Sequence, residues 1–134
     1  MMNPITTTIP RIFVLEPDDD TRPVLKYNLQ NWGYQVIIAV DEADAIQRIQ
    51  ERQEQFDLIL LNQAEKPIDE LIAIGHQIRQ GVERDGHVPI LIMMEQYGPD
   101  LEGQDVQMSD NEYVTYLEDG QQLKDLLQRL CPIR

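Results

Sequence analysis

The sequence predicts a doubly wound α/β domain, in which five parallel strands form one sheet with helices on both faces. Three observations lead to this prediction. Short apolar runs, typical of strands buried on both faces of a sheet, alternate with segments whose apolar residues recur every three or four positions. The connections are short, and 134 residues suffice for one domain. Such alternation implies parallel strands joined by right-handed helical crossovers.

The first strand follows a lead segment of the chain. Residues 1–10 are rich in threonine and proline and are expected to be disordered, whereas residues 11–134 form the single domain. The run RIFVL at 11–15 is the first strand. An acidic turn follows it, and Asp20 or Thr21 is the expected N-cap of the first helix. The apolar positions of this helix are Val24, Leu25, Leu29 and Trp32.

The next two strands repeat the pattern. Residues 34–40 form the second strand, and Asp41 is the expected cap of the second helix. The third strand, at 58–61, is an unbroken apolar run that is entered from Asp57 and left at Asn62. Because ligands bind at the carboxyl ends of the strands in open α/β sheets, Asn62 stands where chemistry is expected.

The last part of the chain is less regular. A third helix that starts near Pro67 leads to the fourth strand, at 88–94. Residues 95–112 contain two glycines and a proline among many polar residues, so any helix there is short or irregular. Whether a fourth helix forms is therefore left open. A fifth strand at 113–117 and a final helix capped by Asp119 complete five units.

Charge and composition exclude several classes of function. The formal net charge of −13 argues against binding to nucleic acid or anionic membranes, because both require a basic patch. The single cysteine, Cys131, allows no internal disulfide and fits a reducing compartment. No apolar segment approaches the length that spans a membrane, and the N-terminus lacks the pattern of a secretory signal. We therefore expect a cytoplasmic protein.

Several features occur in an order and spacing typical of one family. They are the acidic turn after the first strand, its distance from residue 62, the Gly-Tyr pair at 33–34, the Val-Pro pair at 88–89 and the tyrosine at 113. Over residues 11–131 the chain thereby resembles the receiver domain of two-component response regulators. The resemblance implies the flavodoxin-like strand order 2-1-3-4-5, with the site where strands one and three diverge.

The resemblance also assigns the positions of the phosphorylation site. The aspartate that accepts the phosphoryl group corresponds to Asn62, whose neutral amide cannot form an acyl phosphate. The two adjacent acids that hold Mg²⁺ correspond to Glu16 and Pro17, and proline has no side-chain oxygen. Asp18 is the next acid, but it is out of register. Too little negative charge remains to hold Mg²⁺, so we expect no metal and no other cofactor.

Three further positions are the counterparts of the family's conformational switch. The hydroxyl residue at the end of strand four corresponds to Met94, and the lysine at the end of strand five to Tyr116. Tyr113 corresponds to a switch residue whose coupling to the strand-four hydroxyl is broken by Met94. The simpler alternative is that both tyrosines are ordinary sheet residues and that Met94 belongs to the core.

Taken as a resemblance, these departures imply a stand-alone pseudoreceiver that is not phosphorylated and is not an enzyme. It would act as a protein-interaction module in two-component or phosphorelay signalling. The expected partner is a sensor kinase or an output protein, docked on the face built from helix four, strand five and helix five. A homodimer through the same face is the alternative.

Two other functions stay open at the level of sequence. A phosphorylatable receiver with a non-standard acceptor would use Asp18 or Glu16. A small magnesium-dependent phosphatase-like enzyme is suggested by the string from Asp18 to Thr21, which loosely resembles the haloacid-dehalogenase signature DxDxT. The simpler explanations are that the acidic run caps a helix and that Asn62 is a polar strand end.

Overall fold

The computed structural model describes residues 9–52, 55–82, 87–95 and 97–133. Its elements are β1 Arg11–Leu15, α1 Thr21–Asn31, β2 Gln35–Ala39, α2 Glu42–Arg52, β3 Leu58–Asn62, α3 Ile68–Val82, β4 Ile90–Met93, the 3-10 turn η1 Pro99–Leu101, β5 Asp105–Ser109, β6 Glu112–Thr115 and α4 Gly120–Leu130. The expected disorder of residues 1–10 falls mostly on residues 1–8, which lie outside the described residues.

The strands form one sheet in the order β2-β1-β3-β4-β6-β5. β1 pairs in parallel with β2 and β3, β3 with β4, and β4 with β6. The predicted parallel sheet is thereby confirmed, with β6 in the place of the expected fifth strand. β3 lies between β1 and β4, and all five of its residues are buried, as its apolar run predicts.

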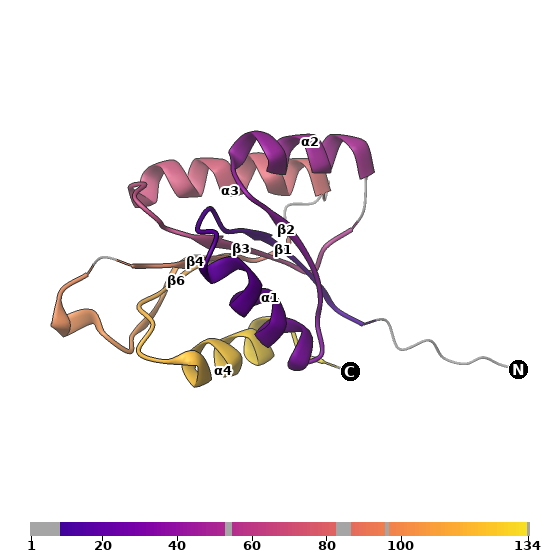
Figure 1. Ribbon diagram of the computed structural model, residues 1–134. Coiled ribbons are helices and arrows are strands. Elements are labelled where there is room, and N and C mark those ends of the chain that lie inside the picture. The colour runs from indigo at the N-terminus through magenta and orange to yellow at the C-terminus, as the bar shows by residue number, and fades with distance from the viewer. Residues whose placement is uncertain (1–8, 53–54, 83–86, 96, 134) are drawn as a thin grey trace, which may run out of the picture.

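Helices cover both faces of the sheet and give three layers, as Figure 1 shows. α2 and α3 lie on one face, and α1 and α4 on the other. Because side chains alternate along a strand, Phe13 and Ile59 join the core on the α2 and α3 side, whereas Val14 and Leu60 join the core on the other. In the described ranges, no helix is long and apolar enough to cross a membrane.

Side-chain caps fix the starts of two helices as predicted. Asp41 accepts the N–H of Asp44 at 2.7 Å, and Asp119 accepts the N–H of Gln122 at 3.0 Å. Asp20 occupies the N-cap position of α1, but its side chain makes no cap hydrogen bond. The first turn of α1 is held instead by the carboxylate of Asp18, which accepts the N–H of Thr21.

The stretch after β4 differs from the five-unit prediction. Among its described residues there is no α-helix, only the 3-10 turn η1 and the strand β5. β5 pairs antiparallel with β6 and forms the sheet edge, with a register shift between Gln107 and Ser109. Glycine and proline break any helix here, whereas Val106 is half-buried in the edge strand. The predicted count of five strands was thus one short, and the expected docking face consists of η1, β5, β6 and α4.

Candidate functional site

Two polar side chains meet at the carboxyl ends of the central strands. β1 ends at Leu15 and pairs with β3, which ends at Asn62, so Glu16 and Asn62 become neighbours. The Nδ2 of Asn62 donates a hydrogen bond to Oε1 of Glu16 over 2.6 Å. Glu16 is 0% exposed and Asn62 5%. The acid and the amide therefore form a buried pair at the edge where α/β sheets place their ligands.

Backbone groups satisfy the remaining oxygens of this pair. The N–H of Asp18 donates to Oε2 of Glu16 at 3.2 Å, and the N–H of Ala64 donates to Oδ1 of Asn62 at 3.3 Å. Ala64 adopts a left-handed φ of 50°, uncommon for a residue with a Cβ, in the turn that makes this contact. A carboxylate can only accept, so the NH₂ group of Asn62 faces Glu16. Both polar atoms of each side chain therefore take part in a hydrogen bond.

The pKa of Glu16 reflects its burial. Removal from water raises the pKa of this carboxyl, and the hydrogen bonds from Asn62 and Asp18 offset part of the rise. The negative charges of Glu95 and Asp18 raise it further. In this pair the Asn62 amide supplies the partial positive charge that a cation would otherwise supply to the acid.

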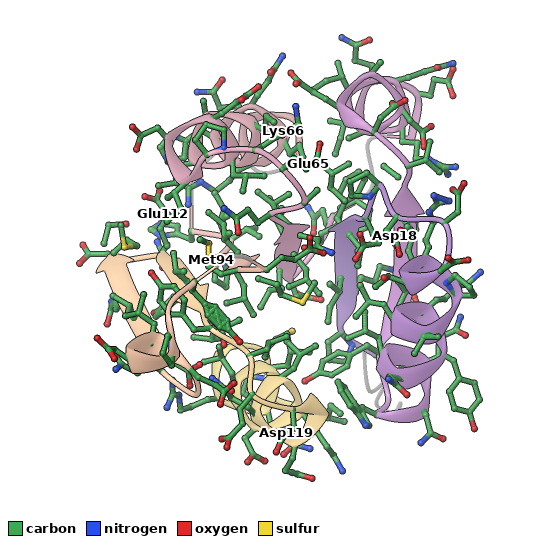
Figure 2. All side chains as sticks on the ribbon, turned by 60° about the vertical axis from the view of Figure 1, so that its left-hand side comes forward. Asp18, Glu65, Lys66, Met94, Glu112 and Asp119 are labelled. Atoms are coloured by element: carbon green, nitrogen blue, oxygen red, sulfur yellow. The ribbon has the colours of Figure 1, made fainter. Side chains whose placement is uncertain are left out.

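The carboxylate of Asp18 serves α1 and not the cleft. Its Oδ2 accepts from the backbone N–H of Thr21 at 2.8 Å and from the Thr21 hydroxyl at 2.5 Å. The hydroxyl bond is the main reason that the pKa of Asp18 lies below its usual range. Within the acidic run, Asp18 therefore caps the first turn of α1. Asp18 and Met94 lie on either side of the end of β3 in Figure 2.

These residues do not fit a magnesium site. Glu16 has both oxygens bonded, Pro17 has no side-chain oxygen, and Asp18 is held by Thr21. Mg²⁺ needs oxygen ligands in near-octahedral geometry and gives up its water reluctantly. Within the described part of the chain, no three side chains of His, Cys, Asp or Glu are grouped so as to hold a metal ion.

The structure brings Met94 and Tyr116 together on one face of the sheet. Met94 is 9% exposed and belongs to the core on the α2 and α3 side, against which Tyr116 packs. The ring of Tyr116 meets that of Tyr97 edge to face, with centroids 5.5 Å apart. The Tyr97 hydroxyl donates to the carbonyl of Leu117 at 2.5 Å. Where the resemblance implies a hydroxyl and a lysine, these positions carry a thioether and an aromatic ring.

Tyr113 lies apart from those two residues. It packs against the core on the α1 and α4 side, and its hydroxyl donates to the carbonyl of Asp110 at 3.3 Å. The alternation of side chains along β6 explains the separation, because Tyr113 and Tyr116 are three positions apart and point to opposite faces.

A polar cluster between α3 and β6 was missed by the sequence analysis. Nε2 of His76 lies 2.5 Å from Oε2 of Glu112, and Arg79 donates to the same oxygen at 2.9 Å. Burial raises the pKa of Glu112, but hydrogen bonds from His76, Ser109 and Arg79 outweigh it and hold the pKa below its ordinary value. Figure 2 labels Glu112 on the same side of the sheet as α3. The cluster ties α3 to the start of β6.

A second polar cluster, also missed, joins β5, β6 and α4. The hydroxyl of Thr115, a fully buried residue, donates to Oδ1 of Asp105 at 2.7 Å. Gln122 donates through Nε2 to Asp105 at 2.9 Å and to the Thr115 hydroxyl at 3.2 Å. Sequence carries no signal for either cluster, because each joins side chains from separate elements.

Comparisons with known proteins bear on the fold. No protein-family model matches the sequence, and no curated protein matches it. Chemotaxis protein CheY4 of Vibrio cholerae matches with a TM-score of 0.66 at 19% identity, covering 92% of this chain and 99% of that one. Response regulator TrrA of Thermotoga maritima matches in complex with Mg²⁺-BeF (TM-score 0.64, 22% identity, 91% and 99% covered) and in complex with the histidine kinase ThkA (0.65, 21%, 92% and 99%). The chain therefore has the fold of response-regulator receiver domains.

Proposed function

We propose that this chain is a receiver-like protein-interaction module of two-component or phosphorelay signalling, and that residue 62 is not phosphorylated. The hydrogen bond from Asn62 to Glu16 carries the proposal. It uses the side chain at the acceptor position as a structural partner of a buried acid. We place this function in the cytoplasm, where the fold's signalling partners would be met.

Phosphoryl transfer to a side chain requires a nucleophilic oxygen and positive charge around the phosphoryl oxygens. The Asn62 amide is neutral and already bonded on both sides. Its neighbour Glu16 is a buried acid, which supplies no positive charge to an incoming phosphoryl group. Met94 and Tyr116 add no positive charge at the ends of β4 and β6. The chemistry of an acceptor site is thus missing at residues 17, 62, 94 and 116, and the acid that is kept, Glu16, is bonded to Asn62.

The two alternative functions gain no support from this geometry. A non-standard acceptor would need a free carboxylate in the cleft, but Glu16 is paired with Asn62 and Asp18 with Thr21. A phosphatase of the DxDxT kind would need the acids from Asp18 onward to converge on a metal, whereas they form the start of α1.

The proposed docking face is built from η1, β5, β6 and α4. The cluster of Thr115, Asp105 and Gln122 holds β5 and α4 together, so the face is one unit. Met108 on β5 is 50% exposed, which gives the face an apolar contact. The related fold of TrrA has been seen bound to a histidine kinase. We propose a sensor kinase or an output protein as the partner, with a homodimer through the same face as the alternative.

Acetyl phosphate with Mg²⁺ tests the absence of phosphorylation. Intact-mass spectrometry of the wild-type chain after incubation is expected to show no phosphorylated species, while TrrA of Thermotoga maritima, whose structure contains Mg²⁺-BeF, serves as the positive control. A phosphorylated species of this chain, with the modified residue mapped to Glu16, Asp18 or any other cleft residue, would contradict the proposal.

Affinity capture from the native host tests the docking face. The wild-type chain and a Met108→Glu variant are compared, with Tyr27→Glu on α1 as a matched control because Tyr27 is also exposed. We expect Met108→Glu to lose a signalling protein that the control retains. Recovery of the same proteins by all three chains would count against docking through β5.

A further inference from the structure

A groove runs along the outer edge of β2, the strand at the opposite end of the sheet from β5. It has a volume of about 450 Å³ and lies between α1, β2 and α2. Its lining consists of Arg22, Pro23 and Lys26 from α1, Val36, Ile37 and Ile38 from β2, and Arg48 from α2. Helices on both faces of the sheet thus flank a strand whose outer edge is unpaired.

The backbone of β2 leaves hydrogen-bonding groups open along this groove. Gln35 donates its N–H to the carbonyl of Pro10, and the carbonyl of Ala39 accepts from Glu16, so these residues of β2 bond inward to β1. In a parallel pair the intervening residues bond to the other side, which directs the N–H and C=O of Val36 and Ile38 outward. The next outward N–H, that of Val40, is already bonded to the Asp44 carboxylate at 2.9 Å.

The open edge of Val36 and Ile38 is therefore bounded by a side-chain cap at its carboxyl end. Among the described residues, none is hydrogen-bonded to the outward groups of these two residues. An edge of this kind accepts an additional strand through main-chain hydrogen bonds.

The charge of the groove selects the strand that fits. Its lining contains three cations and no acid, although the whole chain has 11 Lys and Arg against 24 Asp and Glu. Lys26 makes no ion pair with any described residue. Arg22 pairs with Asp19 and also donates to the carbonyl of Glu16, and Arg48 pairs with Asp44. In each pair one side chain, Asp19 or Arg48, is open to water, which weakens the pair. The groove is thus a local region of positive charge on an acidic protein.

The two faces of β2 define where the acids of a bound strand would lie. Val36 and Ile38 pack toward the α1 side and Ile37 toward the α2 side. A strand beside β2 alternates in the same way, so alternate side chains face Arg22 and Lys26, and the intervening ones face Arg48. Acids in both sets of positions would meet cations.

We propose that the β2 edge is a second docking site, which binds an extended acidic segment of a partner protein as an additional strand. Main-chain bonds to Val36 and Ile38 supply the pairing, and Arg22, Lys26 and Arg48 supply the preference for acids. The inference does not rest on the proposed function, because the groove and the β5–β6–α4 face are at opposite edges of the sheet.

The test uses a fluorescein-labelled peptide of about ten residues, which is long enough to span β2. Glutamate and valine alternate along the peptide except for one run of three glutamates, which places acids on both faces of the bound strand. We expect saturable binding by fluorescence anisotropy. In ¹⁵N-resolved NMR, the amides of Val36 and Ile38 shift and exchange more slowly with solvent. Lys26→Glu and Arg48→Glu each weaken binding by about tenfold, whereas Lys124→Glu on α4, with the same change of charge, leaves it within about twofold.

A second variant separates strand pairing from simple charge attraction. Val36→Pro removes an outward N–H without removing a bond to β1, and it should abolish binding while the circular dichroism spectrum stays that of the wild type. If this variant does not fold, slowed exchange at Ile38 in the wild type is the deciding observation.

Four results would overturn the proposal. The first is equal binding of a peptide in which glutamine replaces glutamate, and the second is unchanged amide exchange at Val36 and Ile38 when the peptide is added. The third is that inorganic phosphate displaces the peptide and gives saturable NMR shifts at Val36 and Ile38. The fourth is tighter peptide binding by a chain that lacks residues 1–8. The last would identify the chain's own N-terminal segment as the occupant of the edge.

Discussion

Asn62 donates its amide N–H to the buried carboxyl of Glu16 across 2.6 Å, at the position that the resemblance to receiver domains assigns to the phosphoryl acceptor. The two side chains lie 46 residues apart in sequence and meet because β1 and β3 are neighbours. Every terminal oxygen and nitrogen atom of the two side chains takes part in a hydrogen bond. Replacing either member therefore changes the stability of the protein as well as its chemistry.

The variant Asn62→Asp should destabilise the protein and should not be phosphorylated. It places a second carboxyl against Glu16, and like charges at this distance in a buried site oppose ionisation. We expect a loss of about 2–3 kcal/mol in the free energy of unfolding, measured by urea denaturation at neutral pH. Acetyl phosphate with Mg²⁺ should give no phosphorylated species, because Pro17 and Tyr116 are still in place.

The double variant Glu16→Gln with Asn62→Asp provides the matched control. It exchanges donor and acceptor but keeps one hydrogen bond between the two positions, so most of the lost stability should return. A double variant as unstable as Asn62→Asp alone would show that the pair does not act through this hydrogen bond. Rapid phosphorylation of Asn62→Asp by acetyl phosphate would show that the acceptor site is more intact than we describe.

The titration of Glu16 should lower the free energy of unfolding as pH rises. Because burial raises its pKa in the folded protein, the neutral form is favoured there. This contribution is fully present below the unfolded pKa of about 4.3 and is lost as pH rises through the folded pKa. Glutamine does not titrate, so the stability of Glu16→Gln relative to wild type should increase as pH rises from the unfolded pKa of about 4.3 toward neutrality. A constant difference in urea denaturation across this range would contradict it.

Glu112 should act in the opposite direction. Its hydrogen bonds with His76, Ser109 and Arg79 hold its folded pKa below the ordinary value, so its stabilisation is present above the unfolded pKa and is lost as pH falls through the folded pKa. Glu112→Gln should cost about 1–2 kcal/mol at neutral pH in thermal or urea unfolding. Gln107→Glu on the exposed strand β5 serves as a control for a change of one charge on this hairpin. Equal stability of Glu112→Gln and wild type would show that the cluster contributes nothing.

Thr115→Val should loosen the docking face. The substitution preserves shape but removes the buried hydroxyl that bonds Asp105, at a cost of about 1–2 kcal/mol. Because the same cluster holds β5 to α4 through Gln122, amide hydrogen exchange in β5 should accelerate more than exchange in β2. Uniform acceleration across the sheet would show a global effect and no local coupling.

Most of the fold could be predicted because its central strands are apolar runs and its helices have periodic apolar faces. β3 shows this most plainly, since all its residues are buried. The exception is β5, whose burial pattern is largely exposed, so its sequence lacks the apolar alternation by which a half-buried strand is recognised. Its formation depends on pairing with β6, which is a tertiary interaction.

The candidate site was predictable in its positions but not in its contacts. The end of β3 at Asn62 and the turn at Glu16 follow from strand ends, whereas their hydrogen bond depends on side-chain orientation. The direction of Asp18 toward Thr21 is likewise a local geometric outcome. The groove at β2 was not predicted, because the cations that line it come from two helices.

An NMR titration of the wild-type chain with Mg²⁺ and beryllofluoride tests the central claim most directly, with the side-chain NH₂ resonances of Asn62 as the reporter. The account predicts no saturable shift of these resonances, because the Asn62 amide is hydrogen-bonded to Glu16 and the residues around it do not form a cation site. A saturable shift that requires both Mg²⁺ and beryllofluoride would contradict it, since a phosphoryl mimic would then bind at side chain 62.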